Sequence, residues 1–163
     1  MDERVAVLRK RPHGKIAGVE QGAVEETRLA MDLLAEREGC TRFATLGLCS
    51  GAEILGFVED VGRHNAADAI SGQMWLEGTP GHDKIFYTTG RLTSEIVMKV
   101  TQMGIPILLS RSGVTHMGLE LAEITGVTMI ARAKGKHFLV YSGADNVIYD
   151  AVPTKRPGDL RKR

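Results

Sequence analysis

The sequence predicts an α/β protein with a three-layer α/β/α architecture, in which a mostly parallel sheet carries one antiparallel strand at its edge. Apolar runs of strand length alternate along the chain with stretches of helical periodicity, and glycines separate many of these segments. The chain has 163 residues, of which 43% are hydrophobic, and this is enough for one ordinary core. We therefore expect a single domain over residues 1–152 and a solvated basic tail over residues 153–163.

The first half of the chain predicts two helices with two extended segments between them. A helix is expected over residues 23–38, because apolar residues recur there at helical spacing and Gly39 follows as a stop. The expected segments after it are strands at 42–48 and 52–60 and a helix at 65–78.

The second half begins with a strand, a helix and a second strand. Residues 83–89 and 105–110 are apolar runs of strand length, and residues 94–104 between them have helical spacing and end in a glycine. Such a unit is expected to be right-handed, with its two strands parallel.

The same pattern then repeats. A helix is predicted over residues 114–126, with Thr115 as its N-cap and Gly126 as its stop, and a strand follows at 127–132. A tight turn into residues 137–143 would add an antiparallel strand at the sheet edge.

Composition excludes several classes of function. The formal net charge of +1 gives no reason to expect a nucleic acid or an anionic membrane as a partner. No apolar run approaches the roughly 18 residues that a membrane span needs, so a cytoplasmic protein is expected. The two cysteines, Cys40 and Cys49, do not form a CxxC pair, and reduced thiols are expected.

An arginine follows each of four predicted strands. Ligands of such sheets bind outside the carboxyl ends of the parallel strands, and arginine binds phosphate or carboxylate with two donors. Four arginines at corresponding positions predict a shared site for a polyanionic small molecule, namely Arg63, Arg91, Arg111 and Arg132. The alternative is that these arginines pair with acidic neighbours and join loops together.

The stretch EDVGRHN, residues 59–65, has the densest chemistry in the chain. A carboxylate from Glu59 or Asp60 beside His64 could orient an imidazole for acid–base catalysis. Alternatively, one of these carboxylates caps the following helix, while Arg63 and Asn65 bond to neighbouring loops. We expect Arg63, His64 and Asn65 to shape a ligand site at the end of the strand.

Five segments together resemble the FdhD family, the formate dehydrogenase accessory proteins. They are VEDVGRHNAADAISG, YTTGRLTSEIV, GIPILLSRSGVT, LAEITGVTMIARAKG and FLVYSG, and the resemblance runs from about Val24 to Gly143. It implies a cytidine-deaminase-like fold and a Mo-bis(molybdopterin guanine dinucleotide) cofactor. It further implies a homodimer, a cysteine desulfurase that supplies sulfur, and a molybdenum or tungsten formate dehydrogenase apo-enzyme that receives the cofactor.

The resemblance assigns cofactor binding to the segment from Ile130 to Gly135, which agrees with the expected anion site. The expected cofactor-binding residues are Ile130, Ala131, Arg132, Ala133, Lys134, Gly135, Arg63, His64, Asn65, Thr89, Gly90, Arg91, Ser110 and Arg111. No metal ligands are expected.

The sequence departs from the family at the residues that carry sulfur. Family members have a CxxC motif whose cysteine bears the persulfide; this chain begins about where that motif would end and contains no CxxC. The family pattern TGG-x-H reads TLGLC here, which puts Cys49 at the histidine position and makes it the candidate catalytic thiolate.

Two further functions remain open. A binding module could hold the cofactor or another nucleotide without transferring sulfur. A zinc deaminase relative would need an H/C-x-E motif and a PCxxC motif. Cys49 instead has a glutamate four residues later, at Glu53, and no PCxxC follows.

Overall fold

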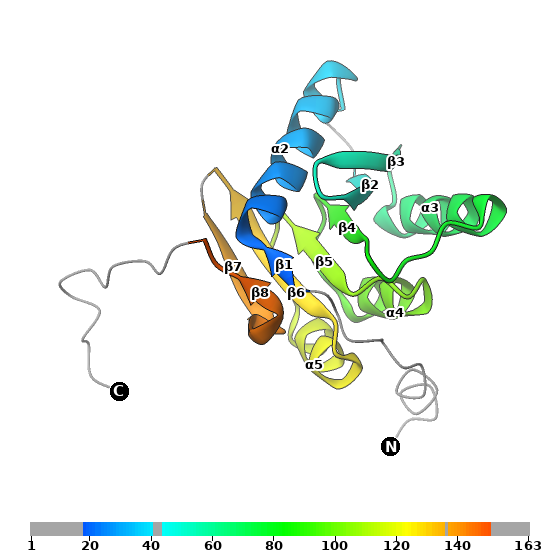
Figure 1. The fold of residues 1–163 in the computed structure, drawn as a ribbon. Helices are drawn as coiled ribbons and strands as arrows, with labels where there is room; N and C mark the ends of the chain where they lie inside the picture. Colours follow the sequence, from blue (N-terminus) through cyan, green and yellow to red (C-terminus); the bar gives the residue numbers. More distant parts are fainter. Residues whose placement is uncertain (1–17, 41–43, 136, 151–163) are drawn as a thin grey trace, which may run out of the picture.

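A six-stranded sheet forms the centre of the computed structural model, which describes residues 18–40, 44–135 and 137–150 (Figure 1). The strand order across the sheet is β3-β2-β4-β5-β6-β7. The strands are β2 (Ala44–Ser50), β3 (Glu53–Asp60), β4 (Ile85–Thr88), β5 (Ile107–Ser110), β6 (Thr128–Lys134) and β7 (His137–Ser142). The predicted basic tail, 153–163, lies outside the described residues.

The sheet is mixed, which corrects the prediction of a mostly parallel sheet. β4, β5 and β6 are parallel to one another, but β2 is antiparallel to both β3 and β4, and β7 is antiparallel to β6. The reversal of β2 arises because a two-residue turn at Gly51 and Ala52 joins β2 and β3 as a hairpin. β3 still runs in the direction of β4, so the predicted strand ends do meet at one edge of the sheet.

Helices cover both faces of the sheet, as the three-layer prediction requires. α3 (Arg63–Glu77), α4 (Ser94–Gln102) and α5 (His116–Thr125) pack on one face, and α2 (Gln21–Arg37) packs on the other. On the face of α2, a second small sheet pairs β1 (Val19–Glu20) with β8 (Val147–Ile148), which follows the short helix η1 (Ala144–Asn146). The sequence pattern did not predict this pair.

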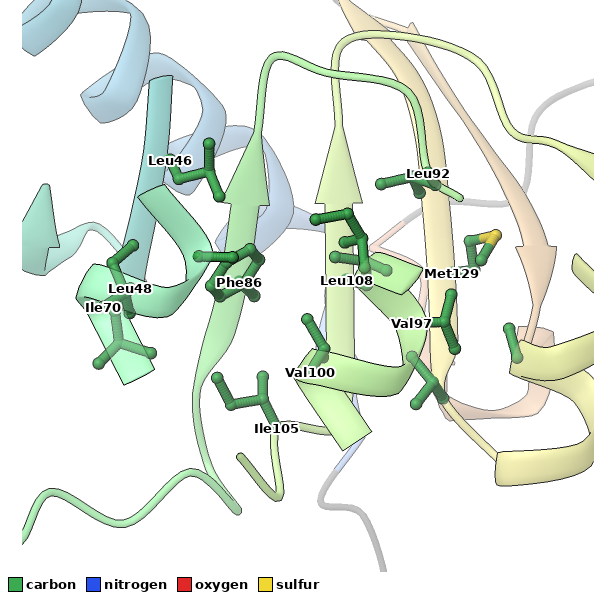
Figure 2. Close-up of a cluster of buried hydrophobic side chains, with 14 of the residues drawn as sticks. Leu46, Leu48, Ile70, Phe86, Leu92, Val97, Val100, Ile105, Leu108 and Met129 are labelled. Atoms are coloured by element: carbon green, nitrogen blue, oxygen red, sulfur yellow. The ribbon is translucent and has the colours of Figure 1, made fainter. Parts of the chain in front are cut away.

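Two apolar clusters hold the layers together. Figure 2 shows the larger cluster, where Phe86 and Leu108 of neighbouring strands face Val97 and Val100 of α4. The second cluster, here called the α2-side cluster, packs α2 on the opposite face of the sheet through Met31 and other buried side chains. Strand residues alternate between the two clusters, as expected for a sheet that is buried on both faces.

The ends of α5 agree with the sequence. The Thr115 hydroxyl accepts a hydrogen bond from the Gly118 backbone N–H at 3.2 Å, and Gly126 ends the helix with a φ of 75°. α3 begins at Arg63, two residues before the prediction. Among the described residues, no helix is long and apolar enough to cross a membrane.

Candidate functional site

A cavity of about 660 Å³ opens between α2 and the edge of the sheet where β4, β5 and β6 end. This α2 cavity has a wall from α2 and a wall from the strand ends. Its lining residues are Met31, Asp32, Ala35, Glu36, Cys40, Thr45, Tyr87, Thr89, Arg111, Ser112, Ala133, Lys134 and Gly135. The position agrees with the rule that ligands of α/β sheets bind beyond the carboxyl ends of the strands.

A bulge in β6 brings the Gly-Lys segment to this cavity. Ile130 packs on the α2 face and Ala131 on the opposite face, so regular alternation would turn Ala133 away from α2. Arg132 instead has a φ of 53° and the pairing with β7 shifts there, which returns Ala133 to the α2 face. The bulge therefore places Ala133, Lys134 and Gly135 in the cavity lining.

The side chain of Arg132 does not line the cavity. Its Nε donates a hydrogen bond to the Tyr141 hydroxyl at 3.2 Å, and its backbone N–H donates to the Ser112 carbonyl at 2.8 Å. Arg132 thus supports the shape of the segment rather than presenting its guanidinium to the cavity.

Asp32 organises the charges in the interior of the cavity. Its carboxylate lies 2.8 Å from Arg28 Nη1 and 3.4 Å from Arg111 Nη1, and it accepts a 3.3 Å hydrogen bond from the Tyr87 hydroxyl. Burial, and next the charge of Asp32, raise the pKa of Tyr87 above its ordinary value. Arg111 is therefore held in the lining by a carboxylate, and Tyr87 stays a neutral donor.

Hydroxyl side chains shape the loops at the strand ends. The Thr45 backbone N–H donates to the Thr89 hydroxyl at 3.0 Å, and both residues line the cavity. The Ser110 hydroxyl donates to the Gly90 carbonyl at 2.7 Å and accepts from the Ser112 N–H at 2.9 Å. Ser110 and Gly90 thus position the loops without lining the cavity.

From Gly62 onward, the EDVGRHN stretch lies on the other face of this edge, at the start of α3, whereas Glu59 at the end of β3 faces Cys40 of the cavity lining. Asp60 Oδ1 accepts hydrogen bonds from the Gly62 N–H at 2.7 Å and from Asn65 Nδ2 at 3.3 Å. His64 Nε2 lies 2.8 Å from Glu95 Oε2 on α4. No side-chain hydrogen bond caps α3, so the capping predicted for Glu59 or Asp60 is wrong, and Asn65 bonds within the motif rather than to a neighbouring loop.

Arg63 contacts the loop after β4 at a glycine. A Cβ added to Gly90 would lie 2.9 Å from Arg63 Cδ, so the loop approaches the arginine closely. Neither residue lines the α2 cavity, and the exposed Arg91 does not line it either. A role in ligand binding stays a prediction for these residues and for His64 and Asn65.

Neither cysteine has the environment of a thiolate. Cys49 is fully buried in the α2-side cluster, and burial raises the pKa of its thiol to about 12. Cys40 lines the cavity, and a hydrogen bond with Glu59 is the main cause that raises its pKa to about 11. A catalytic role for Cys49 stays a prediction that its burial does not favour.

The sequence did not predict the α2 wall of the cavity. Asp32 and Glu36 stand one helical turn apart, which is the spacing of two carboxylates on one helix face. That spacing is visible in the sequence, but only the fold shows that this face covers the strand ends. Among the described residues, no group of three or more His, Cys, Asp or Glu side chains could hold a metal ion.

Comparison with known proteins identifies the family. The model of the FdhD/NarQ family matches residues 18–148, which includes every residue that lines the α2 cavity. The chain belongs to the FdhD/NarQ family. The resemblance found in the sequence motifs is thereby confirmed.

Relatives of this FdhD/NarQ chain include proteins from two bacteria that are named sulfur carrier protein FdhD. The protein from Listeria monocytogenes serotype 4b is 40% identical over 100 residues, which are 61% of this chain and 38% of the relative. The protein from Wolinella succinogenes is 33% identical over 133 residues, which are 82% of this chain and 46% of the relative. The chain thus spans half or less of the length of these two relatives.

A solved structure has the same fold. It is a protein from Desulfotalea psychrophila, provisionally described as a formate dehydrogenase accessory protein, and it is 26% identical with a TM-score of 0.76. The match covers 87% of this FdhD/NarQ chain and 62% of that chain.

Proposed function

We propose that this chain is an accessory protein for the maturation of a molybdenum or tungsten formate dehydrogenase. In this proposal it binds the molybdopterin guanine dinucleotide cofactor, and the guanine nucleotide part enters the α2 cavity. The single observation that carries the proposal is that Ala133, Lys134 and Gly135 line this cavity beside Arg111. These three residues belong to the segment to which the resemblance assigns cofactor binding.

The size and chemistry of the cavity fit a nucleotide. Small-molecule sites have volumes of about 300–1,000 Å³, and the α2 cavity lies within this range. Arg111 and Lys134 supply positive charge for phosphate groups, and Ser112 supplies a hydroxyl next to them. Gly135, with a φ of 60°, has no side chain to obstruct the approach of a ligand to the backbone.

Two cationic residues of the cavity would bind the phosphates in different ways. Lys134 would bind the phosphates as a flexible point charge, while Arg111, held by Asp32, would bind them in a fixed orientation. Once bound, the cofactor supplies the metal-centred redox chemistry of the enzyme that receives it. This chain would shield and orient the cofactor before it reaches the apo-enzyme.

The proposal covers cofactor binding and leaves the sulfur to a separate donor. Sulfur carriage needs an accessible thiolate, whereas Cys49 is buried and both thiols have a raised pKa. A cysteine desulfurase would be the source of sulfur and the formate dehydrogenase apo-enzyme the recipient of the cofactor.

A calorimetric titration of the full chain with GDP tests the proposal. We expect saturable binding that Lys134→Gln weakens by about 10-fold to 150-fold, because a hydrogen bond to a charged group contributes about 1.5–3 kcal/mol. Lys99→Gln is the matched control, since Lys99 is a partly exposed lysine of α4, on the opposite face of the sheet, and does not line the cavity. Cys49→Ala should bind GDP as the unchanged protein does.

Two results would contradict the proposal. One is no saturable binding of GDP at millimolar concentration. The other is equal weakening by Lys134→Gln and Lys99→Gln, which would mean that GDP binding depends on the overall charge of the protein and not on this cavity.

A further inference from the structure

The two walls of the α2 cavity carry opposite charges, and only Asp32 and Arg111 form an ion pair between the walls among the described residues. Glu36 is exposed on the α2 wall and Lys134 is exposed on the strand-end wall. Neither side chain has an ion pair or a hydrogen bond with any residue that the structure describes. The cavity therefore offers an unpartnered acceptor on one side and an unpartnered cation on the other.

The neighbouring carboxylate, Asp32, differs from Glu36 because its bonding capacity is in use. It contacts Arg28, Arg111 and the hydroxyl of Tyr87. A ligand that needs a carboxylate would have to displace these groups at Asp32, whereas Glu36 is available.

The position of Glu36 does not stabilise its own helix. Glu36 is the second-last residue of α2, and the C-terminal end of a helix carries partial negative charge. A carboxylate at that end is unfavourable by a few tenths of a kcal/mol or more, so helix stability does not explain its presence.

We propose that Glu36 recognises the guanine base of the nucleotide bound in the α2 cavity, while Lys134 and Arg111 bind its phosphates. The inference rests on the proposed function. Guanine has two adjacent donors on one edge, the ring N1–H and the exocyclic N2 amino group, and an ionised carboxylate accepts two such bonds in parallel. Adenine presents an acceptor at its ring N1 beside a single amino donor, so one carboxylate oxygen would face a lone pair.

Three nucleoside diphosphates separate base recognition from phosphate binding. GDP has both donors, IDP lacks the exocyclic amino group, and ADP has the unfavourable acceptor. We expect the full chain to bind GDP about tenfold more tightly than IDP, the lower bound for a hydrogen bond to a charged group. ADP should bind more weakly than IDP.

The variant Glu36→Gln keeps the shape of the side chain and removes its charge. We expect it to weaken GDP binding about tenfold, to affect IDP less, and so to reduce the preference for GDP over IDP to within about threefold. The matched control is Glu123→Gln, an exposed glutamate of α5 on the opposite face of the sheet, which should leave all three affinities unchanged.

The outcomes distinguish this inference from the proposed function. If GDP binding depends on Lys134 but Glu36→Gln leaves the GDP-to-IDP preference unchanged, Glu36 does not recognise the base, and the proposed function stands. Tighter GDP binding by Glu36→Gln would place the carboxylate near the phosphates and also overturn the inference. If the unchanged chain does not bind GDP, the proposed function fails and the inference fails with it.

Discussion

The backbone of Arg132 determines which residues reach the cavity. Its φ of 53° is in the left-handed region, which costs a non-glycine residue about 1–2 kcal/mol. Hydrogen bonds from its backbone to Ser112 and from its side chain to Tyr141 hold this conformation. Strain at this residue is thus part of how the Lys134 side chain is delivered to the site.

Two substitutions at Arg132 separate the backbone from the side chain. We expect Arg132→Val to lower the free energy of unfolding by about 1–3 kcal/mol, because a β-branched residue tolerates a positive φ poorly. Arg132→Gly removes the same side chain but accepts this conformation, so it should cost less than Arg132→Val. Urea unfolding measures both, and an equal loss would show that the contact with Tyr141 matters and the backbone conformation does not.

The sequence indicated the location of the site better than its individual contacts. Arg111 directly follows β5 and Lys134 is the last residue of β6, and both line the cavity. Arg132 also belongs to the predicted segment, yet its guanidinium bonds to the Tyr141 hydroxyl. The bulge that redirects this side chain could not be predicted, because its residue with positive φ is not a glycine. Local patterns show which residues follow a strand but not the direction in which a bulge turns each side chain.

At the scale of elements, α2 lies close against the sheet because Gly47 has no side chain. A Cβ at Gly47 of β2 would overlap Met31 Sδ and Cε, and Met31 is 1% exposed. The wall of the cavity that carries Asp32 and Glu36 therefore depends on a small residue in the neighbouring strand.

We expect Gly47→Ala to lower the free energy of unfolding by about 1–3 kcal/mol, the usual cost of overpacking a core. Met31→Ala alone should also destabilise, by about 2–5 kcal/mol, because it leaves a cavity. The double variant should be more stable than the sum of the two effects predicts, since the new methyl group occupies part of the vacated space. Urea unfolding of the three variants measures this coupling.

A glycine without such a neighbour provides the control. A Cβ added to Gly72 in α3 would meet open space, so Gly72→Ala should stabilise the protein by about 0.5–1 kcal/mol through helix propensity. Strictly additive effects of Gly47→Ala and Met31→Ala would show that the two positions do not share one packing site.

The elements themselves were largely predictable. Periodicity and glycine stops identified α4 and α5, and the repeated strand, helix and strand order gave the parallel pairs of β4, β5 and β6. The direction of β2 was not predictable from its apolar pattern, because a buried strand has the same pattern in either direction. Nor did the pattern show that α2 covers the cavity edge.

For the whole molecule, the raised pKa of the buried Cys49 thiol lowers the free energy of unfolding at alkaline pH. The pKa of Cys49 is about 12 in the folded protein, against an ordinary value of 9.0. The unfolded chain therefore loses this proton first as the pH rises above about 9, and the folded state becomes less favourable until about pH 12. This group alone reduces the free energy of unfolding by up to about 1.4 kcal/mol per pH unit in that window.

Urea unfolding of the full chain and of Cys49→Ala, at about pH 8 and about pH 10.5, tests this dependence. Both proteins should lose stability at the higher pH, because the pKa of Tyr87 is also raised. The loss should be smaller in Cys49→Ala, by about 1–2 kcal/mol, since the variant lacks the buried thiol. Equal losses in the two proteins would mean that Cys49 ionises without cost in the folded state.

The short pair of β1 and β8 determines how the domain would respond to tension. These strands are parallel, with Val19 beside Val147 and Glu20 beside Ile148, and they lie at the two ends of the described chain. A pulling force on the flanking segments would act along both strands in opposite directions and load their hydrogen bonds in shear. Detachment of this pair would remove Val19 and Val147 from the α2-side cluster before the central sheet bears load. Mechanical unfolding from either end is thus expected to begin at the layer that forms the cavity wall.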